Sequence, residues 1–263
     1  MFAWFRDHKR RELLSQPFPK EWAGILEKNM SHYALLSEEE RKRLHDDLRI
    51  LIAEKFWEGC SGLVLTDEIK VTIAGQAALL LLGLLKHDYY ANTQSILVYP
   101  AGFRIPERVV GPAGVVEETR RDVLGLAWNQ TLPVILSWSD ALSGGLNATD
   151  GHNVVLHEFA HKLDLKDGAP DGVLELEDDP QYETWAEVMS AEYQELVQLS
   201  EHRHASLLSS YGAINAAEFF AVATEAFFEK SVRMHEEHAR LYGVLRGFYH
   251  QDPAARVLAH QQE

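Results

Sequence analysis

The feature that most constrains this chain is the pattern H-E-x-x-H at residues 157–161. Its two ends, His157 and His161, are four residues apart, and residues at that spacing share one face of an α-helix. The flanking residues are mostly apolar, which favours a buried helix over a pair of surface histidines on an amphipathic one. Because burying two histidines and a glutamate without a partner is costly, the pattern predicts a helix over residues 150–164 that binds a metal ion.

The residue types in this pattern point to zinc chemistry. Two imidazole rings on one helix face can both coordinate one Zn²⁺ ion, at about 2.0–2.1 Å from each ring nitrogen. Glu158 stands beside the first ligand, where it can hold a metal-bound water and take its proton. The pattern therefore predicts metal-assisted hydrolysis, with His157 and His161 as metal ligands and Glu158 as the general base.

A catalytic zinc site takes three protein ligands and keeps a fourth position open, so a third ligand must come from elsewhere. Asp167 follows His161 by six residues, but Asp164 stands where that kind of pattern needs a glycine turn. Glu183 and Glu187 lie on the next expected helix, at a separation that several metallopeptidases use. These residues give two possible sources of the third ligand.

The segment 215–225 offers another source, because it is mostly apolar apart from Glu218 and Glu225. These two glutamates are seven residues apart, which places both on one helix face. Charged residues on an apolar helix need a partner, and a metal with its histidines supplies one. Asn215 and Glu218 also fit a capping box, which would explain Glu218 but not Glu225. Spacing alone leaves the third ligand open between Glu218 and its rivals.

Helical periodicity dominates the chain, and short β-rich runs occur only in its middle, which predicts an α+β fold that is mainly helical with a small β-sheet. We expect helices over residues 20–57, 68–86, 150–164, 181–200, 215–230 and 236–248. We expect strands over residues 95–100, 123–128 and 131–138, a turn at 143–145 and a polar loop over 166–180. Ser37 and Glu40 form a predicted capping box, and Pro133 predicts an edge strand or the start of one.

Composition excludes several classes of function. The 263 residues carry 25 Lys and Arg against 40 Asp and Glu, a net charge of −15, which argues against a nucleic-acid-binding surface. Cys60 is the only cysteine, so there is neither an internal disulfide nor a cysteine-type metal site. The longest apolar run, residues 77–85, is far shorter than the roughly 20 residues of a membrane span, and no secretory signal is visible. We expect a cytoplasmic protein with no membrane contact.

The segments 157–164 and 217–222, together with 95–100 and 136–138, resemble the Mlc titration factor A family of bacterial zinc-dependent peptidases. The resemblance covers residues 20 to 255. That family is similar to the catalytic domain of anthrax lethal factor, which implies a gluzincin-like metallopeptidase core. We therefore expect residues 91–263 to form the zinc metallopeptidase region and residues 1–90 a helical region packed on it, in one compact unit.

The resemblance implies one Zn²⁺ ion per chain and places the family's third zinc ligand on Glu218. A family tyrosine that faces the metal falls on Tyr211, which could donate a hydrogen bond to the developing oxyanion; a tyrosine packed under the helix is the alternative. Asp164 and Glu225 share faces with the predicted ligands, so each could orient a ligand histidine.

The resemblance also implies two activities. One is aminopeptidase-like cleavage of a peptide substrate. The other is binding of a DNA-binding transcriptional repressor, because the family's namesake binds the glucose-responsive repressor Mlc and relieves repression of sugar-transport genes. The alternative is a non-catalytic protein that sequesters a regulator and keeps zinc for structure. A structural zinc is usually closed by four protein ligands and has no use for Glu158, so the intact pattern favours the enzyme.

Overall fold

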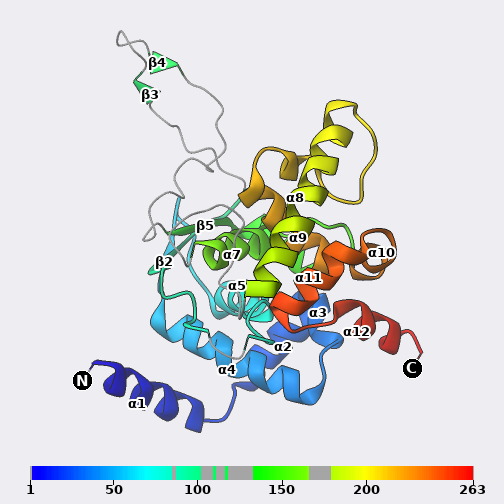
Figure 1. Cartoon of the computed structure of the whole chain (residues 1–263). Coiled ribbons are helices and arrows are strands. Elements are labelled where there is room, and N and C mark those ends of the chain that lie inside the picture. The colour runs from blue at the N-terminus through cyan, green and yellow to red at the C-terminus, as the bar shows by residue number, and fades with distance from the viewer. Residues whose placement is uncertain are drawn as a thin grey trace.

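The computed structural model describes residues 2–84, 87–101, 109–110, 116–117, 133–165 and 179–262. Figure 1 shows helices gathered around a small sheet, which confirms the predicted α+β fold. The helices are α1 (Phe2–Ser15), α2 (Lys20–Asn29), α3 (Ser31–Ala34), α4 (Glu38–Glu54), α5 (Asp67–Leu79), α6 (Trp138–Leu146), α7 (Val154–Asp164), α8 (Asp179–Glu201), the 3-10 helix η2 (Ser210–Ala213), α9 (Ala216–Glu229), α10 (Ser231–Glu237), α11 (Ala239–Tyr249) and α12 (Pro253–His260). The strands are β1 (Phe56–Gly59), β2 (Ser95–Tyr99), β3 (Val109–Val110), β4 (Val116–Glu117) and β5 (Val134–Ser137).

Three of these strands form a parallel sheet in the order β1-β2-β5. In β2, Ile96 and Val98 are buried while their neighbours along the strand are partly exposed, as expected for a strand with one face on the core. Strand β5 begins directly after Pro133 and pairs with β2, in register from Ile96 opposite Val134. Within the described part of the chain β5 is an edge strand, so the prediction from Pro133 is confirmed.

Residues 20–57 are largely helical, as expected, and form α2, α3 and α4. The Ser37–Glu40 capping box is present, and it begins α4 as predicted. The helical prediction is wrong at its C-terminal end, however, because the chain leaves α4 after Glu54 and forms β1. Pairing with β2, a contact far along the chain, overrides the local helical pattern there.

The apolar helix expected over residues 68–86 is also shorter than predicted. Helix α5 ends at Leu79, where the side chain of Gln251 donates to the Leu79 carbonyl oxygen at 2.9 Å. A Cβ atom at Gly83 would lie 2.0 Å from the carbonyl oxygen of Tyr249. The turn after α5 therefore packs against backbone at the end of α11, and this close approach is possible only because residue 83 is glycine.

The prediction of a turn at residues 143–145 is wrong, because both glycines lie inside α6. A Cβ atom at Gly145 would lie 2.3 Å from the carbonyl oxygen of Asn29, and one at Gly144 would lie 2.9 Å from the Asn153 side chain. The glycines therefore serve helix packing rather than a turn. They let α6 approach the end of α2 and the start of α7 more closely than any other residue would.

Farther along, the helix expected over 236–248 corresponds to α11, which begins after His238, whereas residues 236 and 237 belong to the end of α10. The strand expected at 123–128 lies outside the described residues, as do residues 166–178 of the expected polar loop; residues 179 and 180 already belong to α8. No helix within the described ranges is both long and apolar enough to cross a membrane.

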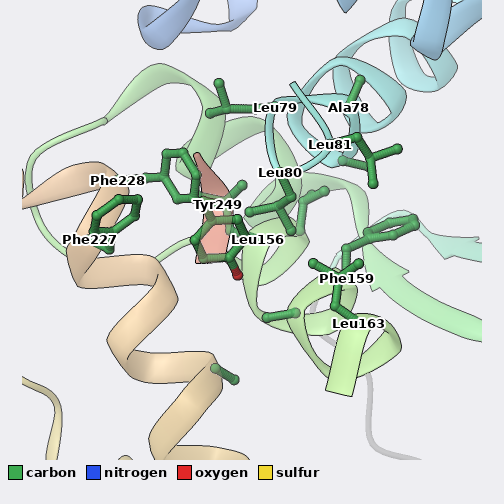
Figure 2. Packing of buried hydrophobic residues seen from close by; sticks show 14 of the residues in the cluster. Ala78, Leu79, Leu80, Leu81, Leu156, Phe159, Leu163, Phe227, Phe228 and Tyr249 are labelled. Atoms are coloured by element: carbon green, nitrogen blue, oxygen red, sulfur yellow. The ribbon is translucent and has the colours of Figure 1, made fainter. Parts of the chain in front are cut away.

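Helices α7 and α9 pack against each other in the middle of the molecule (Figure 1). Figure 2 shows how their apolar side chains join those from the end of α5 and from α11 in one buried cluster, labelled Ala78, Leu79, Leu80, Leu81, Leu156, Phe159, Leu163, Phe227, Phe228 and Tyr249. This core fixes the two helices relative to each other. The proposed division at residue 90 stays a prediction, although β1 and β2 pair across it.

Candidate metal centre

Helix α7 carries the H-E-x-x-H pattern and begins with a strong cap. The side chain of Asn153 accepts hydrogen bonds from the backbone N–H groups of Val155 and Leu156, at 3.1 and 3.0 Å. These bonds satisfy two donors that the first turn of a helix leaves free. The helix then presents Leu156 and Phe159 to the core, while His157 and His161 turn together toward α9.

Helix α9 brings Glu218 to the two histidines. Asn215 caps α9 by accepting a hydrogen bond from the Glu218 backbone N–H at 2.9 Å. The Glu218 carboxylate reaches across to α7, where its Oε2 lies 3.1 Å from His157 Nε2 and its Oε1 lies 3.5 Å from His161 Nε2. Glu218 thus contributes its backbone to the cap and its carboxylate to the cluster with the histidines.

The three side chains form a compact donor set. The Nε2 atoms of His157 and His161 are 3.2 Å apart, and the ligand atoms of the group all lie within 4.8 Å of one another. The exposed fractions of His157, His161 and Glu218 are 9%, 7% and 3%. Two imidazoles and one carboxylate are a donor set that catalytic zinc sites use, so these residues fit a zinc ion. Among the residues that the structure describes, no other group of His, Cys, Asp and Glu meets this geometry.

The electrostatics of this cluster favour a bound cation. Burial alone lowers the pKa of His157, but hydrogen bonds to Glu218 and Glu225 outweigh it and raise that pKa to about 10. Burial alone raises the pKa of Glu218, but the hydrogen bonds from His157 and His161 lower it to about 2. Both shifts arise because positive charge on the histidines and negative charge on the carboxylates stabilise each other. A divalent metal ion satisfies the same demand and displaces the protons.

The comparison with protein families agrees with this geometry. Residues 4–250 match the family described as "Glucose-regulated metallo-peptidase M90". The chain belongs to this family. Its buried His-His-Glu cluster is a donor set that a metallopeptidase can use, and the predicted family resemblance is confirmed.

Individual relatives span nearly the whole length of this M90 peptidase. It is 38% identical over 248 residues to slr2042, an uncharacterized protein of Synechocystis sp., covering 94% of this chain and 90% of the relative. It is 29% identical over 259 residues to proteins named Mlc titration factor A from Yersinia pestis and Yersinia pseudotuberculosis, covering 97% of this chain and 92% of each relative.

The structure also places the predicted catalytic residues beside the cluster. Glu158 is half-buried on α7, next to His157. Tyr211 lies in η2, which packs on α9, and its ring centroid is 5.8 Å from that of His157. Tyr211 is therefore a neighbour of the candidate metal site, and its role in catalysis stays a prediction.

The rival third ligands have different positions. Glu183 and Glu187 are exposed on α8, where Glu187 accepts a hydrogen bond from Arg240 at 2.7 Å. Asp167 lies outside the described residues. Of the acidic candidates that the structure describes, Glu218 alone shares the donor set with both histidines.

The two residues expected to orient a ligand histidine are both buried. Glu225 Oε1 lies 2.8 Å from His157 Nδ1, so Glu225 makes the contact that orienting a ligand histidine needs. Asp164 is 1% exposed at the end of α7, and its part in orienting a histidine stays a prediction.

Sequence reasoning missed two polar residues that support the start of α7. Gln76 accepts a hydrogen bond from Asn153 Nδ2 at 2.9 Å, and a lone glutamine within an apolar helix was the available signal. Glu229 accepts from the backbone N–H groups of Gly151 and His152 at 2.9 and 3.0 Å. Burial, with the nearby carboxylates of Asp150 and Glu225 adding to it, raises the pKa of Glu229 to about 8.

Proposed function

We propose that this chain is a zinc-dependent peptidase with one Zn²⁺ ion per chain, held by His157, His161 and Glu218, and with Glu158 as the general base. The observation that supports this proposal is that the side chains of the three donor residues lie close together in the folded chain. Two come from one face of α7 and the third from α9, 57 residues beyond His161 and held there by the packed core. A surface histidine pair would have no reason to face a buried carboxylate.

The residues of the site divide the work of peptide hydrolysis. Zinc, when bound, polarises the scissile carbonyl and lowers the pKa of a water molecule. Glu158 accepts the proton of the attacking water and passes it to the leaving amine, a role that suits a half-buried carboxylate in contact with solvent. The Tyr211 hydroxyl donates a hydrogen bond to the oxyanion that develops on the carbonyl oxygen. An aminopeptidase-like preference is part of this proposal and is supported by the family resemblance.

A repressor-binding role accompanies the peptidase in this proposal, because the Yersinia relatives carry the name Mlc titration factor A. The partner would be a DNA-binding transcriptional repressor of the Mlc type. The chain itself, with its net charge of −15, would not contact nucleic acid. Such a partner would place the chain in the cytoplasm.

The test of the peptidase is Glu158→Gln, measured as metal content and as hydrolysis of peptide substrates with and without a chelator. Glutamine keeps the shape of the side chain but cannot accept the proton, so we expect full zinc content and a fall in turnover of about 10²–10⁴-fold. Glu183→Gln removes an exposed glutamate from α8 and is the matched control, with wild-type turnover expected. Wild-type turnover in Glu158→Gln would contradict the assigned base.

The repressor role has a separate test. Purified Mlc-type repressor should bind the wild-type chain and Glu158→Gln equally, because binding needs no catalysis. If the repressor binds and no peptide is cleaved by the zinc-loaded wild-type chain, the sequestering alternative replaces the peptidase.

A further inference from the structure

Glu225 is a buried carboxylate on α9 that the hydrolytic chemistry does not use directly. It is 6% exposed. Its Oε1 lies 2.8 Å from His157 Nδ1, and its Oε2 accepts a hydrogen bond from the backbone N–H of Asn153 at 2.5 Å. Both oxygens therefore bind α7, one at the ring of a candidate metal ligand and the other at the residue that caps the helix.

The first contact determines which nitrogen of His157 is free to bind a metal. An ionised carboxylate only accepts hydrogen bonds, so the ring must donate its Nδ1–H to Glu225. The lone pair of a neutral ring is then on Nε2, the atom that lies 3.2 Å from His161 Nε2 and 3.1 Å from Glu218 Oε2. Glu225 thus selects the tautomer whose free nitrogen faces the donor cluster.

The second contact holds the start of the helix that carries the ring. Asn153 caps α7 with its side-chain oxygen and donates its Nδ2–H to Gln76 on α5. Gln76 in turn donates to the carbonyl oxygens of Thr72 and Ala141, at 3.0 Å each. A shift of Glu225 would therefore move the ring of His157 and the cap of α7 together.

The charges also require a cation near Glu225. With neutral histidines, Glu218 and Glu225 place two negative charges in a buried region, and a divalent ion at the cluster balances them. Two carboxylates buried on either side of one imidazole are costly unless a positive charge balances them, and a metal ion at the cluster supplies that charge.

We propose that Glu225 is a positioning residue: by accepting from His157 Nδ1 and from the Asn153 backbone at once, it fixes the tautomer and direction of His157 and thereby sets the affinity of the site for zinc. This inference rests on the proposed zinc site. It assigns to Glu225 no contact with the substrate.

Helix α9 also offers a matched control. Glu229 lies one turn beyond Glu225 and is equally buried, but it uses a single oxygen, Oε2, to accept from two backbone N–H groups. Its other oxygen, Oε1, is buried and makes no hydrogen bond within the described part of the chain. In Glu229→Gln the amide oxygen keeps both contacts. In Glu225→Gln the single oxygen can serve only one donor, and the amide NH₂ faces the other.

The experiment compares these two variants of the full chain, loaded with zinc. Zinc affinity is measured by competition with a chromophoric chelator, and the Nδ1 proton of His157 is observed by NMR in protein with ¹⁵N-labelled histidine. We expect Glu225→Gln to weaken zinc binding by about 10–100-fold and to shift or remove the low-field Nδ1 proton signal of His157. Glu229→Gln should leave both unchanged.

Three outcomes would overturn the proposal. One is wild-type zinc affinity together with an unshifted His157 signal in Glu225→Gln. Another is an equal loss of affinity in Glu229→Gln, which would mean that a change at any buried carboxyl group on α9 acts through stability alone. If Glu225→Gln does not fold, the wild-type spectrum decides, because a zinc-loaded His157 without a proton on Nδ1 contradicts the assigned tautomer. Zinc bound with normal affinity but no peptide cleaved would refute the peptidase and leave the role of Glu225 intact.

Discussion

His32 is a buried histidine far from the metal site in sequence, and it connects the N-terminal helices to α9. It lies on α3 with 5% of its surface exposed, and its Nε2 is 3.3 Å from the carbonyl oxygen of Phe228 near the end of α9. Burial lowers the pKa of His32 from 6.5 to about 4, more than the hydrogen bond to Phe228 raises it. The nearby Arg256, which pairs with Glu40, lowers it further.

This shift makes the stability of the fold depend on pH. Above pH 6.5 His32 is neutral in both the folded and the unfolded chain, so it has no effect. As the pH falls from about 6.5 to about 4, the unfolded chain takes up a proton that the folded chain refuses, and stability is lost. The two pKa values differ by about 2.5, and each pH unit corresponds to about 1.4 kcal/mol, so the loss is about 3 kcal/mol.

The assay is urea unfolding at a series of pH values between 4 and 7, with wild type and His32→Gln compared as metal-free proteins so that loss of zinc does not contribute. Glutamine stays neutral, so the free energy of unfolding should fall over this range by about 3 kcal/mol less in His32→Gln than in wild type. His204→Gln removes an exposed histidine and should follow the wild-type curve. Parallel curves for wild type and His32→Gln would refute the reasoning, whatever their vertical offset.

Two further predictions concern the metal site. Glu218→Ala should abolish tight zinc binding while Glu183→Ala leaves it unchanged, as measured by zinc titration; a loss of only ~1 kcal/mol in thermal stability with zinc retained would mean that Glu218 acts as a helix cap. Tyr211→Phe should keep zinc and the KM for peptides but lower kcat by about 10²–10³-fold, the typical effect of removing one oxyanion donor; an unchanged kcat would make Tyr211 a packing residue.

Local patterns in the sequence were sufficient for the features that depend on neighbouring residues. The i, i+4 spacing of His157 and His161 places them on one helix face in any helical setting, and the Ser37–Glu40 capping box begins α4 because all its partners lie within one turn. Pro133 likewise limits β5 through its own missing N–H. For the same reason the mainly helical α+β class followed from periodicity alone.

Contacts between distant segments decided the rest. Helix gave way to strand at β1 because residues 56–59 pair with β2. The glycines that suggested a turn lie inside α6, where Asn29 and Asn153 approach the helix too closely for a Cβ atom. Residue spacing alone could not separate Glu218 from the other candidates for the third ligand. The packing of α9 on α7 brings the Glu218 carboxylate, rather than that of Glu183 or Glu187, to the histidines. Spacing describes only one helix at a time, whereas the position of a third donor depends on how two helices pack in the folded core.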